Sequence, residues 1–213
     1  MNIRYKVLAF LLIAGLAAAA DVPPAADLVL TGATVYTAPG AKPITDAIVV
    51  VRDAKIVYVG KNDKKHTPRS ARLLECSGKV IVAGFWNSHV HFTEDAWKDA
   101  AGAPADKLEA HMQEMLTRWG FTTVWDLGSD PQNTLALRKR VEAGEVPGPK
   151  ILMAGDIFPL HGHPVYLPAE LQLPEAATPE DALRMVRGYM YLGLDGTKLF
   201  TGYRIGPSER SGT

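Results

Sequence analysis

The chain has 213 residues, of which 47% are hydrophobic, 22% charged and 8% aromatic. This composition is typical of a globular protein of one or two domains, and it excludes a disordered chain, a collagen and a disulfide scaffold. Because 23 basic residues balance 23 acidic ones, there is no basic field to attract nucleic acid. The single cysteine, Cys76, excludes an intrachain disulfide and a zinc site of four cysteines, and we expect it to be buried as a small apolar side chain.

The first twenty residues have the pattern of a secretory signal peptide. Arg4 and Lys6 precede an uninterrupted run of apolar or small residues, Val7–Ala20, which ends in three alanines. A membrane-spanning helix needs about 20 apolar residues, so this run is short for an anchor. We therefore expect removal of residues 1–20, a periplasmic or secreted protein and no stable membrane anchor. An uncleaved N-terminal anchor is the alternative.

Residues 21–78 are expected to form a small antiparallel β domain. The segment contains short β-rich runs in close order, which is typical of hairpins. These runs are Leu28–Thr31, Thr34–Tyr36, Ala47–Arg52 and Lys55–Val59. The last two runs are joined at Asp53–Ala54. The stretch from Lys61 to Ala71 is polar and contains Pro68, so we expect a surface loop in which His66 is solvated.

From residue 79 to residue 203 the pattern changes to alternating strands and helices, which predicts parallel βαβ units. Val80–Phe85 is a continuous apolar run, as expected of a strand buried on both faces. Further strands are expected at Phe121–Trp125, Lys150–Ala154 and Thr197–Thr201. Helices are expected at Leu108–Trp119, at Leu135–Ala143 and from a Thr178 cap to Gly193. In the last helix we expect the side chains toward the sheet to be Leu183, Val186 and Met190.

His89 and His91 directly follow the first of these strands. In an extended chain, residues two apart point to the same side, so both imidazoles can reach one metal ion. Neutral imidazole binds zinc, nickel or iron near neutral pH. A His-x-His pair can arise by chance, but this one ends an apolar parallel strand, where α/β barrels have their active sites. The pair therefore predicts a metal site.

The residues around this pair resemble the metal-dependent amidohydrolase superfamily, and most closely its imidazolonepropionase-like and dipeptidase-like branches. Residues 80–92 are similar to the family's opening metal motif, with Ala83 in place of the usual proline and Asn87 in place of the more common aspartate. The family's second, third and fourth strands are similar to residues 120–124, 148–155 and 193–200. The resemblance implies an α/β fold: the N-terminal part of a (β/α)8 TIM-like barrel, with about four βα units, preceded by the small antiparallel β domain. Residues 204–213 are expected to be an irregular tail.

The resemblance also implies a metal role for Lys198, at the end of the fourth strand. A buried ammonium would be costly there. Carbon dioxide converts lysine to a carbamate, an anionic oxygen ligand that can bridge two cations. The implied site therefore holds one or two divalent ions, with zinc as the expected metal, on His89, His91 and a carboxylated Lys198. The alternative is a solvent-facing lysine at a strand end.

Two more histidines lie in the loop after the third strand. The family often has a glycine-rich loop there, whose histidine faces the substrate carbonyl. His163 matches that histidine, while His161 replaces a residue that is usually not one. The alternative is a pair of loop histidines without a role. His111 is expected on the solvated side of the first barrel helix. Three acids near strand ends match no ligand of the family and are expected to be solvated or structural: Glu94, Asp95 and Asp126.

The resemblance further implies ligands after later strands, namely histidines after the fifth and sixth and a proton-accepting aspartate after the eighth. A complete barrel needs about 250 residues. We therefore expect a truncated chain that is inactive alone and self-associates through open sheet edges. The function expected by family is hydrolysis of amide or cyclic-amide C–N bonds in small amide, cyclic amide or dipeptide-like substrates. The alternative is a non-catalytic remnant, or a half-barrel that needs a partner chain.

Overall fold

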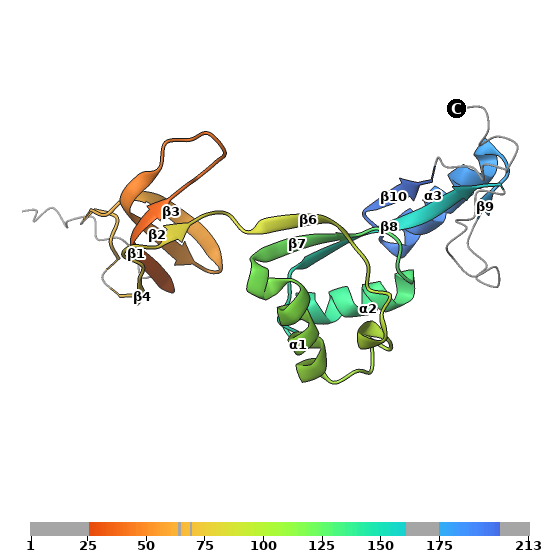
Figure 1. The fold of residues 1–213 in the computed structure, drawn as a ribbon, viewed down its shortest axis with the longest axis horizontal. Helices are drawn as coiled ribbons and strands as arrows, with labels where there is room; N and C mark the ends of the chain where they lie inside the picture. The colour runs from red at the N-terminus through yellow and green to blue at the C-terminus, as the bar shows by residue number, and fades with distance from the viewer. Residues whose placement is uncertain (1–25, 64, 69, 161–174, 201–213) are drawn as a thin grey trace, which may run out of the picture. The chain divides into compact units, whose positions relative to one another are not determined.

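The computed structural model describes residues 26–63, 65–68, 70–160 and 175–200 (Figure 1). The predicted signal peptide, the irregular tail, His161 and His163 lie outside these residues. The chain divides into two compact units, Met1–Ala83 and Gly84–Thr213. Within the described ranges, no helix is long and apolar enough to cross a membrane.

The first unit is built on one β-sheet. Its strands are β1 (Leu28–Val35), β2 (Ile44–Arg52), β3 (Lys55–Lys61), β4 (Arg72–Glu75) and β5 (Val80–Ile81). β1, β2 and β3 are antiparallel neighbours, which confirms the hairpin joined at Asp53–Ala54, whereas the two predicted runs Leu28–Thr31 and Thr34–Tyr36 belong to one strand, β1. β4 and β5 extend this sheet by pairing with β1 in parallel, an addition that the sequence prediction did not include.

A two-residue turn joins β2 to β3. Asp53 and Ala54 have φ values of 49° and 56°, the left-handed conformation that a type I′ hairpin turn requires at both central positions. The backbone N–H of Asp53 donates to Oδ2 of Asp27 at 2.6 Å, which ties the turn to the chain just before β1. The register that follows from this turn buries Ala47 in one cluster with Cys76, which is buried as predicted.

The apolar run Val80–Phe85 does not form one buried strand, contrary to the sequence prediction. Val80 belongs to β5 in the first unit, whereas Phe85 begins β6 (Phe85–Val90) in the second. The two side chains are 62% and 53% exposed. An apolar run shows that burial is favourable, but not which sheet each residue joins. Here the run is shared between two sheets.

The second unit has the predicted alternation of strands and helices. Its parallel strands are β6, β7 (Phe121–Asp126), β8 (Lys150–Pro159) and β10 (Gly196–Leu199), in the order β10-β8-β7-β6. A short strand, β9 (Glu175–Ala176), pairs with the end of β8. The helices are α1 (Ala105–Met115), α2 (Pro131–Glu142) and α3 (Pro179–Leu192), with single 3₁₀ turns η1 (Asp95–Trp97) and η2 (Thr117–Trp119). This succession confirms about four βα units of an α/β barrel.

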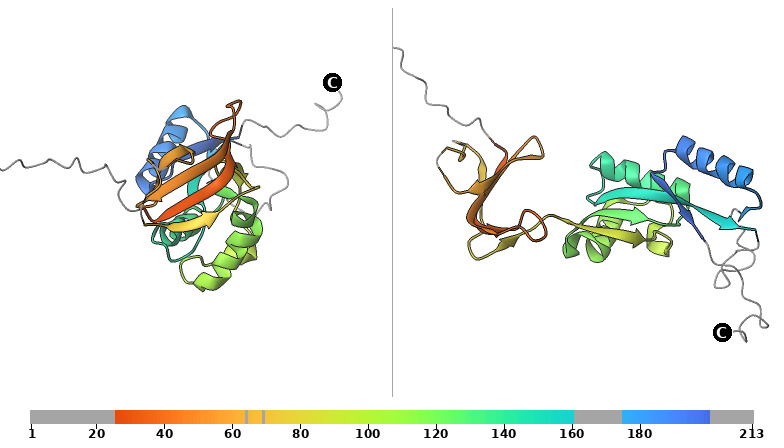
Figure 2. Two further views of the ribbon diagram at one scale, coloured as in Figure 1. Left: turned by 90° about the vertical axis from the view of Figure 1, so that its left-hand side faces the viewer. Right: turned by 90° about the horizontal axis from the view of Figure 1, so that it is seen from above.

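Figure 2 shows α1 and α2 beside strands β6, β7 and β8, and one hydrophobic core joins these two helices to the sheet. Leu108 and Met112 of α1 and Leu137 of α2 are fully buried. They lie in one cluster with Val124 of β7 and Ile151 of β8. Burying one large aliphatic side chain stabilises a fold by ~1.5–3 kcal/mol, so this cluster fixes the helices on one face of the sheet.

Helix α3 begins with the predicted cap. The hydroxyl of Thr178 accepts a hydrogen bond from the N–H of Asp181, whose carboxylate accepts one from the N–H of Thr178, which makes a complete capping box. Gly193 ends the helix with a φ of 85°. The predicted inward face is wrong at Leu183 and at Met190, which is 69% exposed.

The residue of α3 that covers β8 is Tyr189. A Cβ on Gly155 of β8 would lie 2.4 Å from a carbon of the Tyr189 ring, and the Tyr189 hydroxyl donates to the carbonyl oxygen of Asp156 at 2.6 Å. The helix is therefore rotated by one residue, about 100°, from the predicted orientation. Helical spacing alone did not distinguish these two neighbouring faces.

Two histidines that were predicted to be solvated are half-buried. The ring of His66 stacks on Tyr58 with 3.9 Å between the centroids, and its Nδ1 lies 2.8 Å from Oδ1 of Asp63. His111 packs edge-on against Trp97, with 5.7 Å between the ring centroids. Both aromatic partners come from other segments of the chain, which the local pattern around each histidine does not show.

Replacing Leu137 by alanine is expected to lower the free energy of unfolding of the second unit by about 2–5 kcal/mol, because the side chain is fully buried in the helix–sheet core. The matched control is Lys139→Ala, at an exposed position of the same helix, with an expected change within about 0.5 kcal/mol. Urea denaturation followed by circular dichroism measures both changes. Equal unfolding midpoints for the two variants would contradict the assigned core.

Candidate functional site

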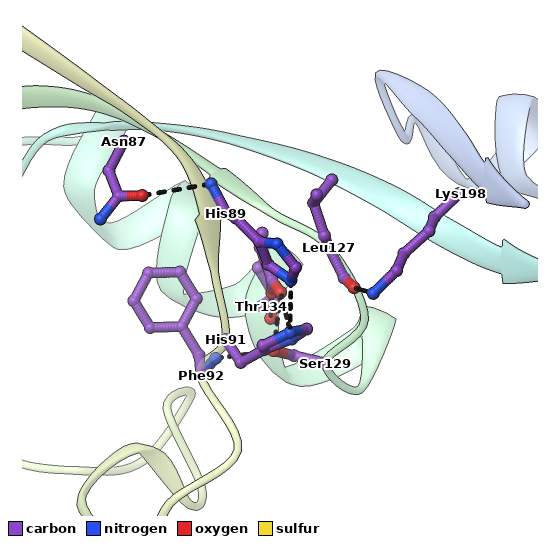
Figure 3. A network of polar contacts seen from close by, with 9 residues as sticks. Asn87, His89, His91, Phe92, Leu127, Ser129, Thr134 and Lys198 are labelled. Atoms are coloured by element: carbon purple, nitrogen blue, oxygen red, sulfur yellow. Dashed lines mark hydrogen bonds and ion pairs between the residues drawn. The ribbon is translucent and has the colours of Figure 1, made fainter. Parts of the chain in front are cut away.

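His89 and His91 lie at the carboxyl end of β6, on the side of the strand away from the helices (Figure 3). Val90, between them, is buried in the helix-covered core, and successive side chains of an extended chain point to opposite sides. The backbone N–H of His89 donates to Oδ1 of Asn87 at 3.1 Å, which steadies the end of the strand. The two imidazoles therefore share one side, as the spacing predicted.

The two histidine rings converge through the same atom. Nε2 of His89 lies 3.1 Å from Nε2 of His91, and the ring planes are 70° apart. Two Zn–N bonds in a tetrahedral site place their nitrogens about 3.3 Å apart, so the pair fits a divalent ion. Among the residues that the structure describes, no group of three or more His, Cys, Asp or Glu side chains is placed to hold a metal. The described residues thus bring together two imidazole nitrogens that could bind one ion.

A buried carboxylate lies behind His91. Asp126, the last residue of β7, is fully buried, and its Oδ1 is 3.9 Å from Nδ1 of His91, a buried atom without a hydrogen-bond partner. Asp126 accepts hydrogen bonds from Ser129 Oγ at 2.8 Å and from Thr134 Oγ1 at 2.7 Å. At this distance the carboxylate makes no hydrogen bond to the ring and acts on His91 through its charge. Asp126 is thus structural rather than solvated.

The electrostatics of this group favour a neutral His91. Burial lowers the pKa of His91; the Asp126 carboxylate raises it, and the charges of Lys198 and His89 lower it further. Burial also raises the pKa of Asp126, against the lowering effect of hydrogen bonds from Thr134 and Ser129. Neutral imidazole is the form that can bind a metal, and the surroundings of His91 favour that form.

The loop Leu127–Ser129 follows β7 and makes hydrogen bonds to the residue after His91 and to Lys198 on β10. Ser129 Oγ accepts a hydrogen bond from the backbone N–H of Phe92 at 2.7 Å, immediately after His91. The carbonyl oxygen of Leu127 accepts one from Nζ of Lys198 at 2.9 Å (Figure 3). The loop thereby brings Lys198, on β10, to the same side of the sheet as the histidines.

Lys198 faces an acid that sequence reasoning missed. In the parallel pairing of β10 with β8, Lys198 lies opposite Asp156. Burial raises the pKa of Asp156 to about 6, while the Lys198 charge lowers it and the Asp126 charge raises it. Oδ1 of Asp156 is buried and has no hydrogen-bond partner. In the sequence, Asp156 is distinguished only as a single acid in the otherwise apolar strand after the second predicted helix.

The other acids near the site are solvated, as predicted. Glu94 and Asp95 are exposed, and Asp95 pairs with Lys98 at 2.6 Å. A groove follows His91 along the chain and has a volume of about 330 Å³. It is lined by Phe92, Thr93, Glu94, Lys98, Asp99, Asp130 and Asn133.

The chain is similar to one curated protein over a limited stretch. It is 38% identical over 68 residues to the exoenzymes regulatory protein AepA of Pectobacterium carotovorum subsp. carotovorum, a match of 31% of this chain and 14% of that protein. No protein-family model matches the chain.

Solved structures match much more of the chain. A prolidase complexed with N-methylphosphonate-L-proline superposes with a TM-score of 0.65 at 23% identity, over 84% of this chain and 47% of that one. A Xaa-Pro dipeptidase with bound methionine gives 0.65 at 20% identity, over 84% and 48%. An amidohydrolase gives 0.64 at 22% identity, over 84% and 47%. The chain thus spans about half the length of these proteins, and over that length it shares their fold.

Proposed function

We propose that this chain contributes a metal-binding half-site to a hydrolase that cleaves amide C–N bonds in small substrates. The observation that carries the proposal is the convergence of the His89 and His91 Nε2 atoms, 3.1 Å apart, at the carboxyl end of a parallel strand. Active sites of α/β barrels lie at this end of the sheet. The fold that the chain shares with a solved amidohydrolase also supports this proposal.

The described residues have separate roles in this proposal. His89 and His91 would hold a divalent ion, with zinc as the first candidate, and such an ion lowers the pKa of a bound water and polarises a carbonyl. The carboxylate of Asp126, 3.9 Å from Nδ1 of His91, would act on the ring through its charge. The hydrogen bond from Phe92 N–H to Ser129 keeps the end of β6 against the following loop. His163 is proposed to face the substrate carbonyl on the strength of its sequence motif alone.

Dipeptides that end in proline are the first substrates to test, because solved structures with this fold include a prolidase and a Xaa-Pro dipeptidase. Simple amides and cyclic amides form the second group.

A non-catalytic half-barrel that needs a partner chain is the second candidate. The observation that favours it is the exposure of large apolar side chains on the two end strands of the described sheet. Trp86 on β6 is 65% exposed and Leu199 on β10 is 66% exposed. An end strand with exposed apolar side chains is suited to pairing with another polypeptide.

Zinc binding is expected to depend on the histidine pair. His89→Ala combined with His91→Ala should abolish stoichiometric zinc uptake, because both converging nitrogens are removed. His66→Ala is the control, since His66 belongs to the first unit and is held by Tyr58 and Asp63. Equilibrium dialysis with elemental analysis measures zinc per chain. Equal zinc content in the double variant and the wild type would refute the site.

Asp126→Asn is expected to weaken zinc binding by about 10–100-fold, because the amide no longer presents a charged carboxylate to His91. Asp95→Asn, at an exposed carboxylate paired with Lys98, should leave the affinity unchanged. Competition with a chelator measures both affinities.

The two candidate functions are separated by assaying the zinc-loaded wild type with Xaa-Pro dipeptides. Turnover supports the hydrolase, and zinc binding without turnover supports the half-barrel.

A further inference from the structure

We infer that Ser129 is the positioning residue of the histidine pair, because its hydroxyl joins the backbone directly after His91 to the carboxylate behind the His91 ring. The inference rests on the proposed metal function and deepens it, since it names a residue that sets the geometry of the pair without being a ligand. Asp126 acts on the ring through its charge, 3.9 Å from Nδ1. A chain of hydrogen bonds from the His91 backbone to the same carboxylate fixes the separation between the ring and that charge.

His91 lies just beyond the sheet pairing that holds its strand. β6 ends at Val90, whose carbonyl oxygen accepts a hydrogen bond from the N–H of Leu127 at 3.1 Å. Two residues on, the N–H of Phe92 donates to a side chain instead, Ser129 Oγ, at 2.7 Å (Figure 3). The peptide group between His91 and Phe92 is planar, so a fixed Phe92 N–H also fixes the carbonyl end of His91. The direction in which the His91 ring leaves the backbone therefore depends on Ser129.

The burial of Phe92 makes this hydrogen bond hard to replace. Phe92 is 3% exposed, and its ring packs edge-on against Trp97 with 5.0 Å between the centroids. A buried N–H without an acceptor is costly, because it has lost its hydrogen bond to water. Ser129 is buried as well. The hydroxyl and the Phe92 N–H therefore hold each other in place.

The Ser129 hydroxyl can make both of its bonds at once. A hydroxyl has one hydrogen to donate and two lone pairs with which to accept. Ser129 Oγ accepts from the Phe92 N–H and donates its own hydrogen to Oδ1 of Asp126 at 2.8 Å. This Oδ1 is the oxygen that lies 3.9 Å from Nδ1 of His91. Donors and acceptors are thus matched along one path, from the His91 backbone to the oxygen behind the His91 ring.

Thr134 provides a matched comparison on the other oxygen of the same carboxylate. Its hydroxyl donates to Oδ2 of Asp126 at 2.7 Å, and the residue is fully buried in the first turns of α2. Both hydroxyls therefore stabilise the charge of Asp126. The path to the backbone after His91 runs through Ser129. Removing either hydroxyl takes one hydrogen bond from Asp126, but removing that of Ser129 also releases the histidine pair.

The first experiment compares zinc dissociation constants of the full chain by chelator competition, under conditions where urea unfolding shows each variant to be folded. Ser129→Ala is expected to bind zinc about tenfold more weakly than the wild type, because the peptide after His91 loses its anchor. Thr134→Val, which keeps the shape of the side chain, is expected to stay within about threefold. Ser129→Thr keeps the hydroxyl and should restore the wild-type affinity.

Two results of this comparison would overturn the inference. Equal losses of zinc affinity in Ser129→Ala and Thr134→Val would show that Ser129 acts through Asp126 alone. A lower unfolding midpoint of Ser129→Ala with unchanged zinc affinity would show that its role is confined to the stability of the fold.

The second experiment measures the pair without metal, by NMR of the zinc-free chain. The 3.1 Å approach of the two Nε2 atoms predicts a nuclear Overhauser contact between the ring protons of His89 and His91. Ser129→Ala is expected to weaken this contact and to speed up hydrogen exchange of the Phe92 amide by at least about tenfold, whereas Thr134→Val should preserve both.

A ring contact that Ser129→Ala leaves unaltered would overturn the inference. Failure of the wild type to bind zinc would refute the proposed metal function instead. In that case the zinc-free spectra would still report whether Ser129 positions the two rings.

Discussion

The buried carboxylate of Asp126 is the group on which the candidate site depends. A carboxylate without solvent is costly unless hydrogen bonds compensate for the lost water. Here the hydroxyls of Ser129 and Thr134 supply them, at 2.8 and 2.7 Å. The same Ser129 hydroxyl accepts from the N–H of Phe92. The end of β6, the loop after β7 and helix α2 therefore meet at one carboxylate, directly behind the His91 ring.

The first turn of α2 extends this arrangement to the loop after β6. The side chain of Asp130 caps the helix by accepting from the N–H of Asn133 at 3.0 Å. The Asn133 side chain in turn donates to the carbonyl oxygen of Trp97 and accepts from the N–H of Ala100, each at 2.8 Å. Thr134, the next residue, reaches Asp126. The first turn of α2 thus lines the groove with Asp130 and Asn133 and contacts the carboxylate behind His91 through Thr134.

The parts of this site that the sequence predicted are those that depend on local geometry. The spacing of His89 and His91 determines that both rings share a side, whatever the rest of the fold does. The cap at Thr178 follows equally from neighbouring residues. Asp156 could not be found in this way, because its importance comes from the register of β8 with β10, which places it opposite Lys198. No local pattern contains that pairing.

The two errors in the fold have the same origin. The run Val80–Phe85 is apolar throughout, and only the pairing of β5 with β1 shows that its first residues join the other sheet. In α3, the spacing of Leu183 and Met190 was as helical as that of the true packing face, and the contact of Tyr189 with Gly155 decides between them. Apolar periodicity reports which faces can be buried. The partner that buries them is a property of the assembled sheet.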